Sequence, residues 1–126
     1  MAGPIVFISR NRIKDGMLGD FREHYSDSIP RTEAGKPETL VQLSYVNAEG
    51  TEVDIVRVFA TAEALDLQLQ GADQRSKAAY QFIEPTGVEI YGTPSAFAME
   101  MLRKVAGSGI DVRVKPDFIG GFIPTR

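Results

Sequence analysis

The sequence contains no cysteine and no tryptophan, and it has a single histidine, His24. Without cysteine the chain has no disulfide bond, no thiolate metal ligand and no cysteine nucleophile. A single histidine also excludes metal sites that are built from several histidines. We find no phosphate-binding loop, zinc signature or Ser-His-Asp arrangement. We therefore expect no metal site in this protein.

Clustered positive charge and long apolar runs are also missing. No run of lysine and arginine exceeds two residues, and the net charge is −3, so we expect no nucleic-acid partner. No apolar run approaches the roughly 20 residues of a membrane span, so we expect no membrane partner. The first four residues lack the positive charge of a secretory signal. These absences together predict a cytoplasmic protein.

The 126 residues, of which 43% are apolar, suffice for one domain with its own core. Apolar and β-branched runs predict strands over residues 5–13, 39–47, 52–60 and 86–92. Apolar residues at helical spacing predict helices over 17–29, after the N-cap Thr61, over 73–83 and over 94–106. Pro30 and Pro85 are expected to end the first and third helices, and Thr93-Pro94 to begin the last.

This order predicts an α+β fold for residues 1–92, namely the ferredoxin-like β-α-β-β-α-β plan. Its sheet is expected to be antiparallel, with the helices on one face. Residues 93–126 add a helix and an arm that contains the alternating Val112 and Val114. Because residues 118–123 are too apolar for a loose tail, we expect this extension to pack on the same domain or on a partner copy.

The predicted strands differ from those of a sheet with one wet face, because charged and apolar residues do not alternate cleanly. The helices can cover only one face of the sheet. The other face therefore predicts a homodimer with a two-fold interface. One face carries Asn11, Gln42, Ser44 and Arg57 among apolar residues. Since buried polar groups need partners, this mixed face favours a pocket for a small molecule over a dry core.

Several local patterns resemble the antibiotic biosynthesis monooxygenase domain, which belongs to the dimeric α+β barrel superfamily. They are Asn11-Arg12 at a strand end, Asp15-Gly16 before the helix, the hairpin, and the run Val56–Leu65. The resemblance covers about residues 4–92. It implies a pocket between sheet and helices, and two sheets that meet at the dimer centre. It also implies oxidation of a small aromatic or quinol-like metabolite by dioxygen without a cofactor.

The same resemblance indicates which branch of the family the chain departs from. The first-strand asparagine of the haem-degrading branch matches Asn11, whereas the tryptophan and the histidine ligand of that branch fall near Gln68 and Ala78. Haem ligation is therefore not expected. The frequent tryptophan at the end of the third strand is Phe59 here, and an asparagine of some oxygenases falls at Ile55.

We predict three catalytic residues. Arg57 would hold an anionic oxygen, Asn11 would donate to the substrate or to dioxygen, and His24 would remove a phenolic proton. The residues expected to line the substrate pocket are Ser9, Phe59, Leu65, Tyr80 and Phe82. Simpler roles are also open. They are a pair of Arg57 with a carboxylate such as Glu89 or one from a helix, a cap of the strand end or a bond to the following turn for Asn11, a surface or boundary position for His24, and plain core for the aromatic residues.

The sequence is therefore compatible with two functions. The first is a cofactor-independent monooxygenase of a small aromatic or quinol-like molecule. The alternative is a non-catalytic dimer of the same fold, which holds a small apolar ligand or is purely structural. A third possibility is that the tail 111–126 builds a larger assembly. A cavity that contains Arg57 and opens to solvent would favour the enzyme.

Overall fold

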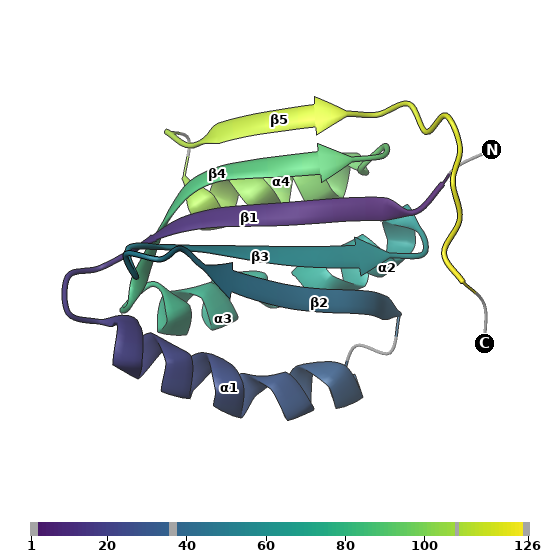
Figure 1. The fold of residues 1–126 in the computed structure, drawn as a ribbon. Coiled ribbons are helices and arrows are strands. Elements are labelled where there is room, and N and C mark those ends of the chain that lie inside the picture. The colour runs from purple at the N-terminus through teal and green to yellow at the C-terminus, as the bar shows by residue number, and fades with distance from the viewer. Residues whose placement is uncertain (1–2, 36–37, 108, 125–126) are drawn as a thin grey trace.

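Strands and helices alternate along the chain largely as predicted. The computed structural model (Figure 1) describes residues 3–35, 38–107 and 109–124; parts of the predicted loop at 35–37 and of the tail lie outside these ranges. The strands are β1 (Ile5–Ile13), β2 (Thr39–Val46), β3 (Glu52–Phe59), β4 (Ile83–Tyr91) and β5 (Asp111–Lys115). The helices are α1 (Leu18–Gly35), α2 (Ala62–Leu69), α3 (Ala72–Ala79) and α4 (Ala96–Ala106).

The sheet has the strand order β2-β3-β1-β4-β5, and the helices gather on one of its faces (Figure 1). β1 pairs antiparallel with both β3 and β4, and β2 pairs antiparallel with β3, which confirms the predicted ferredoxin-like arrangement. The four strands within residues 1–92 thus form the antiparallel sheet that was expected, and β5 of the extension adds to it parallel to β4, so that the whole sheet is mixed. The reason is that the chain returns through the crossover helix α4, and such a crossover joins parallel strands.

Both prolines that were expected to end helices lie inside regular elements. Pro30 lies within α1, which continues to Gly35. Pro30 removes one backbone hydrogen bond, to the carbonyl of Ser26, and both residues are exposed, so water can bind that carbonyl instead. Pro85 lies within β4, which begins at Ile83.

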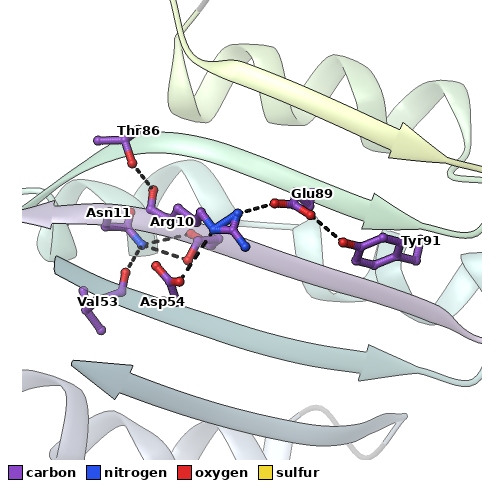
Figure 2. A network of polar contacts seen from close by, with 8 residues as sticks. Arg10, Asn11, Val53, Asp54, Thr86, Glu89 and Tyr91 are labelled. Atoms are coloured by element: carbon purple, nitrogen blue, oxygen red, sulfur yellow. Dashed lines mark hydrogen bonds and ion pairs between the residues drawn. The ribbon is translucent and has the colours of Figure 1, made fainter. Parts of the chain in front are cut away.

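A bulge explains how β4 accommodates Pro85. The register of β1 with β4 shifts between Arg10, which faces Gly87, and Asn11, which faces Pro85. Thr86 is therefore the extra residue of the bulge, and its hydroxyl donates to the carbonyl of Arg10 at 3.2 Å (Figure 2). A proline is tolerated in a sheet at such an irregularity because no ladder hydrogen bond is required of it there.

The helix starts follow local capping chemistry. Thr61 caps α2, as predicted, since its side chain accepts a hydrogen bond from the Ala64 amide at 3.1 Å. The start predicted for the last helix was wrong, because α4 begins at Ala96 and Ser95 is its cap. Ser95 accepts from the Ala98 amide at 3.0 Å and also donates to Asp66 at 2.7 Å. The second bond ties the start of α4 to α2.

Two apolar clusters form the core between sheet and helices. The first surrounds Phe59, Leu65 and Ile90 and includes Ala98 and Leu102 of α4. The helix beyond residue 92 therefore contributes to the same core as the strands. The second cluster joins α1 to the end of β1, to β3 and to the start of β4. Its members are Ile13, Phe21, Val53, Ile55 and Ile83.

The sheet face turned away from the helices is apolar over three adjacent strands. Val41, Val58 and Val6 lie in register across β2, β3 and β1. Leu43, Val56 and Ile8 form the next row, and Leu43 is 49% exposed. On β4 and β5 the same face carries charged and polar residues, among them Glu89, Arg113 and Lys115.

The segment after β5 has no regular structure and runs past the end of the sheet near the N-terminus (Figure 1). Phe118 packs against Gly3, whereas Ile119 is 99% and Phe122 90% exposed. Gly120 and Gly121 between them adopt positive φ angles, which favour glycine. Within this chain the expected packing of the tail is thus met by Phe118 and not by Ile119 or Phe122.

Candidate functional site

A cavity of about 440 Å³ lies between the sheet and the helices. Its sheet wall carries polar residues at the centre, namely Ser9, Asn11, Gln42 and Arg57, and its apolar lining comes from both core clusters. Arg31, Gly35 and Arg75, which are exposed, line it as well. The cavity therefore opens to solvent beside α1 and α3.

The structure brings seven of the eight predicted site residues to this one cavity. They are Ser9, Asn11, His24, Arg57, Phe59, Leu65 and Tyr80. Phe82 was expected there but does not line it. Its ring packs against His24, with 5.3 Å between the ring centroids, on the side of the second core cluster. The misplacement arises because the third helix ends at Ala79, so Phe82 leads into β4 instead of extending a helical face.

Arg57 is held by a chain of neutral hydrogen bonds. Its Nε donates to Oε1 of Gln42 at 3.0 Å, and the Gln42 amide donates to the Tyr25 hydroxyl at 3.1 Å. The Ser44 hydroxyl also bonds to Tyr25. These contacts join β3, β2 and α1, so the guanidinium has a fixed orientation. Its terminal nitrogens have no protein partner in the described ranges, and that end is available to a ligand.

No acidic side chain that the structure describes lines the cavity, although three arginines do. Burial lowers the pKa of Arg57, and the nearby Arg75 lowers it further. The expected alternative, a pair between Arg57 and Glu89, is wrong because Glu89 points to the opposite face. There Glu89 accepts from Arg10 and from Tyr91 (Figure 2).

Asn11 is only 2% exposed, and its amide nitrogen is already engaged. It donates to the Ser9 hydroxyl at 3.1 Å and lies 3.3 and 3.4 Å from the carbonyls of Ser9 and Val53. These acceptors come from β1 itself and from β3, so Asn11 fixes the strand pair under the cavity (Figure 2). Its predicted role as a donor to substrate stays a prediction, and it requires that one of these bonds be exchanged.

Tyr80 follows α3 directly and lines the cavity. Burial raises the pKa of its phenol, and this effect is opposed by a hydrogen bond with Ser76 and by the charge of Arg57. Tyr80 therefore remains a neutral phenol near neutral pH and can serve as a donor or acceptor. His24 of α1 is half-buried on the same cavity, and its role as a base stays a prediction.

Two further polar residues of the cavity were not predicted from the sequence. Tyr25 counts as one of the apolar residues of α1 by spacing, yet its hydroxyl is the meeting point of Gln42 and Ser44. Gln68 is the last residue but one of α2 and is 9% exposed, and its Oε1 has no hydrogen-bond partner in the part of the chain that is described. Only the three-dimensional packing shows that Gln68 faces the cavity.

Comparison with known proteins identifies the fold. No protein-family model matches the sequence, and no curated protein does. A solved structure of MupZ from Pseudomonas fluorescens is similar with a TM-score of 0.70 at 16% identity, over 96% of this chain and 91% of that one. A proposed antibiotic biosynthesis monooxygenase of Bordetella bronchiseptica is similar with a TM-score of 0.57 at 19% identity, over 74% of this chain and 99% of the other.

A second proposed antibiotic biosynthesis monooxygenase, of Bacteroides thetaiotaomicron, has a TM-score of 0.57 at 16% identity, over 70% of this chain and 85% of that chain. These similarities confirm the α+β fold expected from the resemblance to the monooxygenase domain. At such identities they show the fold alone. The match to MupZ covers more of the chain, so it must extend beyond residue 92 into the C-terminal extension.

Neither a membrane span nor a metal cluster is found among the described residues. None of their helices has the length and the apolar character that crossing a bilayer requires. Nor do three or more histidine, aspartate or glutamate side chains of these residues gather to hold a metal ion. The polar groups that line the cavity are guanidiniums, side-chain amides, hydroxyls and one imidazole.

Proposed function

We propose that the protein is a cofactor-independent monooxygenase that acts on a small aromatic or quinol-like metabolite in this cavity. One observation carries the proposal: the partly buried Arg57 faces an otherwise largely apolar cavity in which no described carboxylate neutralises it. A guanidinium in such surroundings binds an anionic oxygen well, because partial burial strengthens the attraction between opposite charges. The anion of a phenol or of an enol fits both the charge and the apolar walls.

The proposed reaction begins when His24 accepts the proton of the substrate and Arg57 holds the oxygen anion that forms. The ring carbon that is made electron-rich donates its electrons to dioxygen and forms a hydroperoxide. That carbon then loses its hydrogen, the O–O bond breaks, and one oxygen remains as a carbonyl while the other leaves as water. With anthrone the balance is anthrone plus dioxygen to anthraquinone plus water.

An oxygen electrode with anthrone or a dihydroxynaphthalene tests this proposal. We expect oxygen uptake that depends on the protein, with one anthraquinone formed for each dioxygen consumed. Arg57→Ala should abolish most of the uptake, whereas Arg10→Ala, on the opposite face of the sheet, should leave it unchanged. Equal turnover by the wild type and by Arg57→Ala would remove Arg57 from the reaction.

A second candidate is a binding protein of the same fold that holds its ligand without turnover. It is favoured by Asn11, whose amide donates within the protein and so offers little to dioxygen. Thermal-shift measurements with quinones, flavonoids and fatty acids would identify a ligand, since a molecule that binds only the folded state raises the melting temperature. Binding without oxygen uptake would favour this second candidate.

We also propose that the protein is a homodimer whose two sheets meet through the apolar face of β1, β2 and β3. The support is the block of apolar residues there, in which Leu43 and Tyr45 are 49% and 64% exposed. Replacing Leu43 by glutamate should convert the dimer to a monomer in sedimentation velocity. A wild type that sediments as a monomer at micromolar concentration would overturn the proposal.

The tail is the second surface available to a partner copy. Ile119 and Phe122 protrude after Lys115 and are almost fully exposed. Truncation at Gly92 would also delete Ala98 and Leu102 of the core, so point variants are the cleaner probe. If the tail sets the assembly, Ile119→Asp and Phe122→Asp together should lower the sedimentation coefficient without lowering the melting temperature of the core. The cytoplasmic location and the boundary at residue 92 remain predictions.

A further inference from the structure

Gln68 is the one buried side chain of the cavity whose hydrogen-bonding capacity the described protein leaves unused. It is 9% exposed, and its Oε1 has no donor within the described residues. The carbonyl oxygen of a buried amide is almost always hydrogen-bonded in native proteins, because leaving it unpaired costs about 1–3 kcal/mol. An acceptor of this kind on the wall of a cavity is what a ligand with a hydroxyl group would satisfy.

The main chain on both sides of this glutamine is fixed. Arg75 donates to the backbone carbonyls of Gln68 and Gln70, the latter at 2.9 Å, where α2 ends. The neighbouring Leu65 and Leu69 are buried in the core. The amide of Gln68 therefore approaches the cavity from a rigid support, which is the condition under which a hydrogen bond discriminates between ligands.

Gln68 and Arg57 belong to opposite walls of the same cavity. Gln68 belongs to the helix layer and offers an acceptor, whereas Arg57 belongs to the sheet and offers donors with a positive charge. A molecule that satisfies both must carry an anionic oxygen at one point and a hydrogen-bond donor, such as a hydroxyl group, at another. A ligand with only one oxygen would leave either the charge or the acceptor unpaired.

We propose that Gln68 is a substrate-recognition residue, and that the cavity selects a small, flat, largely apolar molecule bearing an anionic oxygen for Arg57 and a separate hydroxyl group for Oε1 of Gln68. The inference uses the cavity of the proposed function but does not need its chemistry. Dihydroxylated aromatic compounds and aromatic hydroxy acids belong to this class. Phenols with a single oxygen do not.

Matched carboxylates test the proposal, because their charge is permanent and independent of any deprotonation by the protein. The probes are 2-naphthoate and its hydroxylated derivatives, compared by calorimetry with the wild type and with Gln68→Met and Gln70→Met. Gln70 is an exposed residue at the end of the same helix, so its variant is the control. We expect at least one hydroxynaphthoate to bind the wild type and Gln70→Met about tenfold more tightly than 2-naphthoate does.

In Gln68→Met this preference should disappear while the affinity for 2-naphthoate itself is kept. A wild type that shows no preference for any hydroxylated member, or a preference that survives in Gln68→Met, overturns the proposal. The melting temperature without ligand is an independent measurement. Because the acceptor has no partner among the described residues, Gln68→Met should melt at the wild-type temperature or above it, and a clear decrease would show that Gln68 serves the fold instead.

The two proposals fail in different ways. If hydroxyl preference depends on Gln68 but no aromatic substrate consumes dioxygen, the recognition site stands and the monooxygenase fails. If dioxygen is consumed but Gln68→Met leaves hydroxyl preference unchanged, the monooxygenase stands and the recognition site fails.

Discussion

The arginines on the two faces of the sheet have different partners: carboxylates on the outer face and a neutral amide on the inner face. On the outer face, Arg10 lies between two carboxylates: its Nε is 3.6 Å from Asp54, and it also donates to Glu89, which accepts in addition from Tyr91 (Figure 2). On the inner face, Arg57 donates to the neutral amide of Gln42. Both arginines lie within strands, Arg10 between Ser9 and Asn11 of β1 and Arg57 between Val56 and Val58 of β3. The difference teaches that the position of a charge in a strand says little about its role, whereas the charges across from it say a great deal.

The largest expected effect concerns ligand binding at Arg57. Arg57→Met should weaken the binding of an anionic ligand about 100-fold, since a charge-assisted, bidentate contact with a partly buried guanidinium is lost. Arg10→Met should change the affinity less than about twofold, because Arg10 is on the other side of the sheet. Calorimetry with both variants measures the contrast. Similar losses of affinity in the two variants would show that the ligand does not depend specifically on the arginine of the inner face.

Asn11 offers a way to sharpen the comparison within the inner face. Asn11→Ala should lower the free energy of unfolding by about 2 kcal/mol, because buried acceptors on β1 and β3 lose a donor and a small cavity opens. If Asn11 serves only the strand pair, the affinity for an anionic ligand will stay within about threefold of the wild type. Urea denaturation gives the first quantity and calorimetry the second. A large loss of affinity with little loss of stability would reverse the assignment in favour of the predicted role on substrate.

The stability of the two arginine variants should change in opposite directions. Burial lowers the pKa of Arg57, so folding disfavours its charged form at neutral pH, and Arg57→Met should raise the free energy of unfolding by about 1 kcal/mol. Arg10→Met should lower it by about 1 kcal/mol or less, as for other solvent-accessible ion pairs. Chemical denaturation of both variants without ligand measures the two changes in the free energy of unfolding. Destabilisation by Arg57→Met would mean that this arginine is part of the scaffold.

The smallest expected effect is a pH dependence on the outer face. The hydrogen bond from Tyr91, followed by the one from Arg10, lowers the pKa of Glu89 below its usual value. A carboxyl group with a lowered pKa in the folded state stabilises the protein above its unfolded pKa of about 4.3, and this contribution is lost as the pH falls through the folded pKa. Tyr91→Phe should therefore flatten the loss of stability below about pH 4. Identical acid-unfolding profiles for wild type and Tyr91→Phe would show that the hydrogen bond from Tyr91 to Glu89 does not contribute to stability in solution.

Much of the fold could be predicted because its signals are local. The alternation in β1 and β3, the helical spacing of Leu65 and Leu69, and the Thr61 cap are each encoded within a few neighbouring residues. The predictions of element boundaries failed where pairing with a strand far away in the sequence overrides the local signal. In the sequence Pro85 indicates the end of a helix, but the register of β4 against β1 places it beside a bulge.

The candidate site was predictable to the extent that strand alternation places side chains on one face. Ser9 and Asn11 on one strand and Arg57 and Phe59 on another share the inner face for that reason. Phe82 does not line the cavity because α3 ends earlier than the predicted helix, which places Phe82 just before β4. Gln68 and Tyr25 went unnoticed as polar groups of the cavity because helical spacing does not say whether a buried amide or hydroxyl finds a partner across the core.

By itself, the sequence determined the order of the elements, the face on which each strand residue lies, and the absence of cysteine and tryptophan chemistry. These properties follow from hydrophobic periodicity and composition, which act over a few residues at a time. Only the tertiary structure decided that Arg10 pairs with carboxylates while Arg57 donates to a neutral amide, and that Oε1 of Gln68 finds no donor among the described residues. Such pairings join residues far apart in the chain, and strand register and helix packing choose among partners that the sequence alone leaves equivalent.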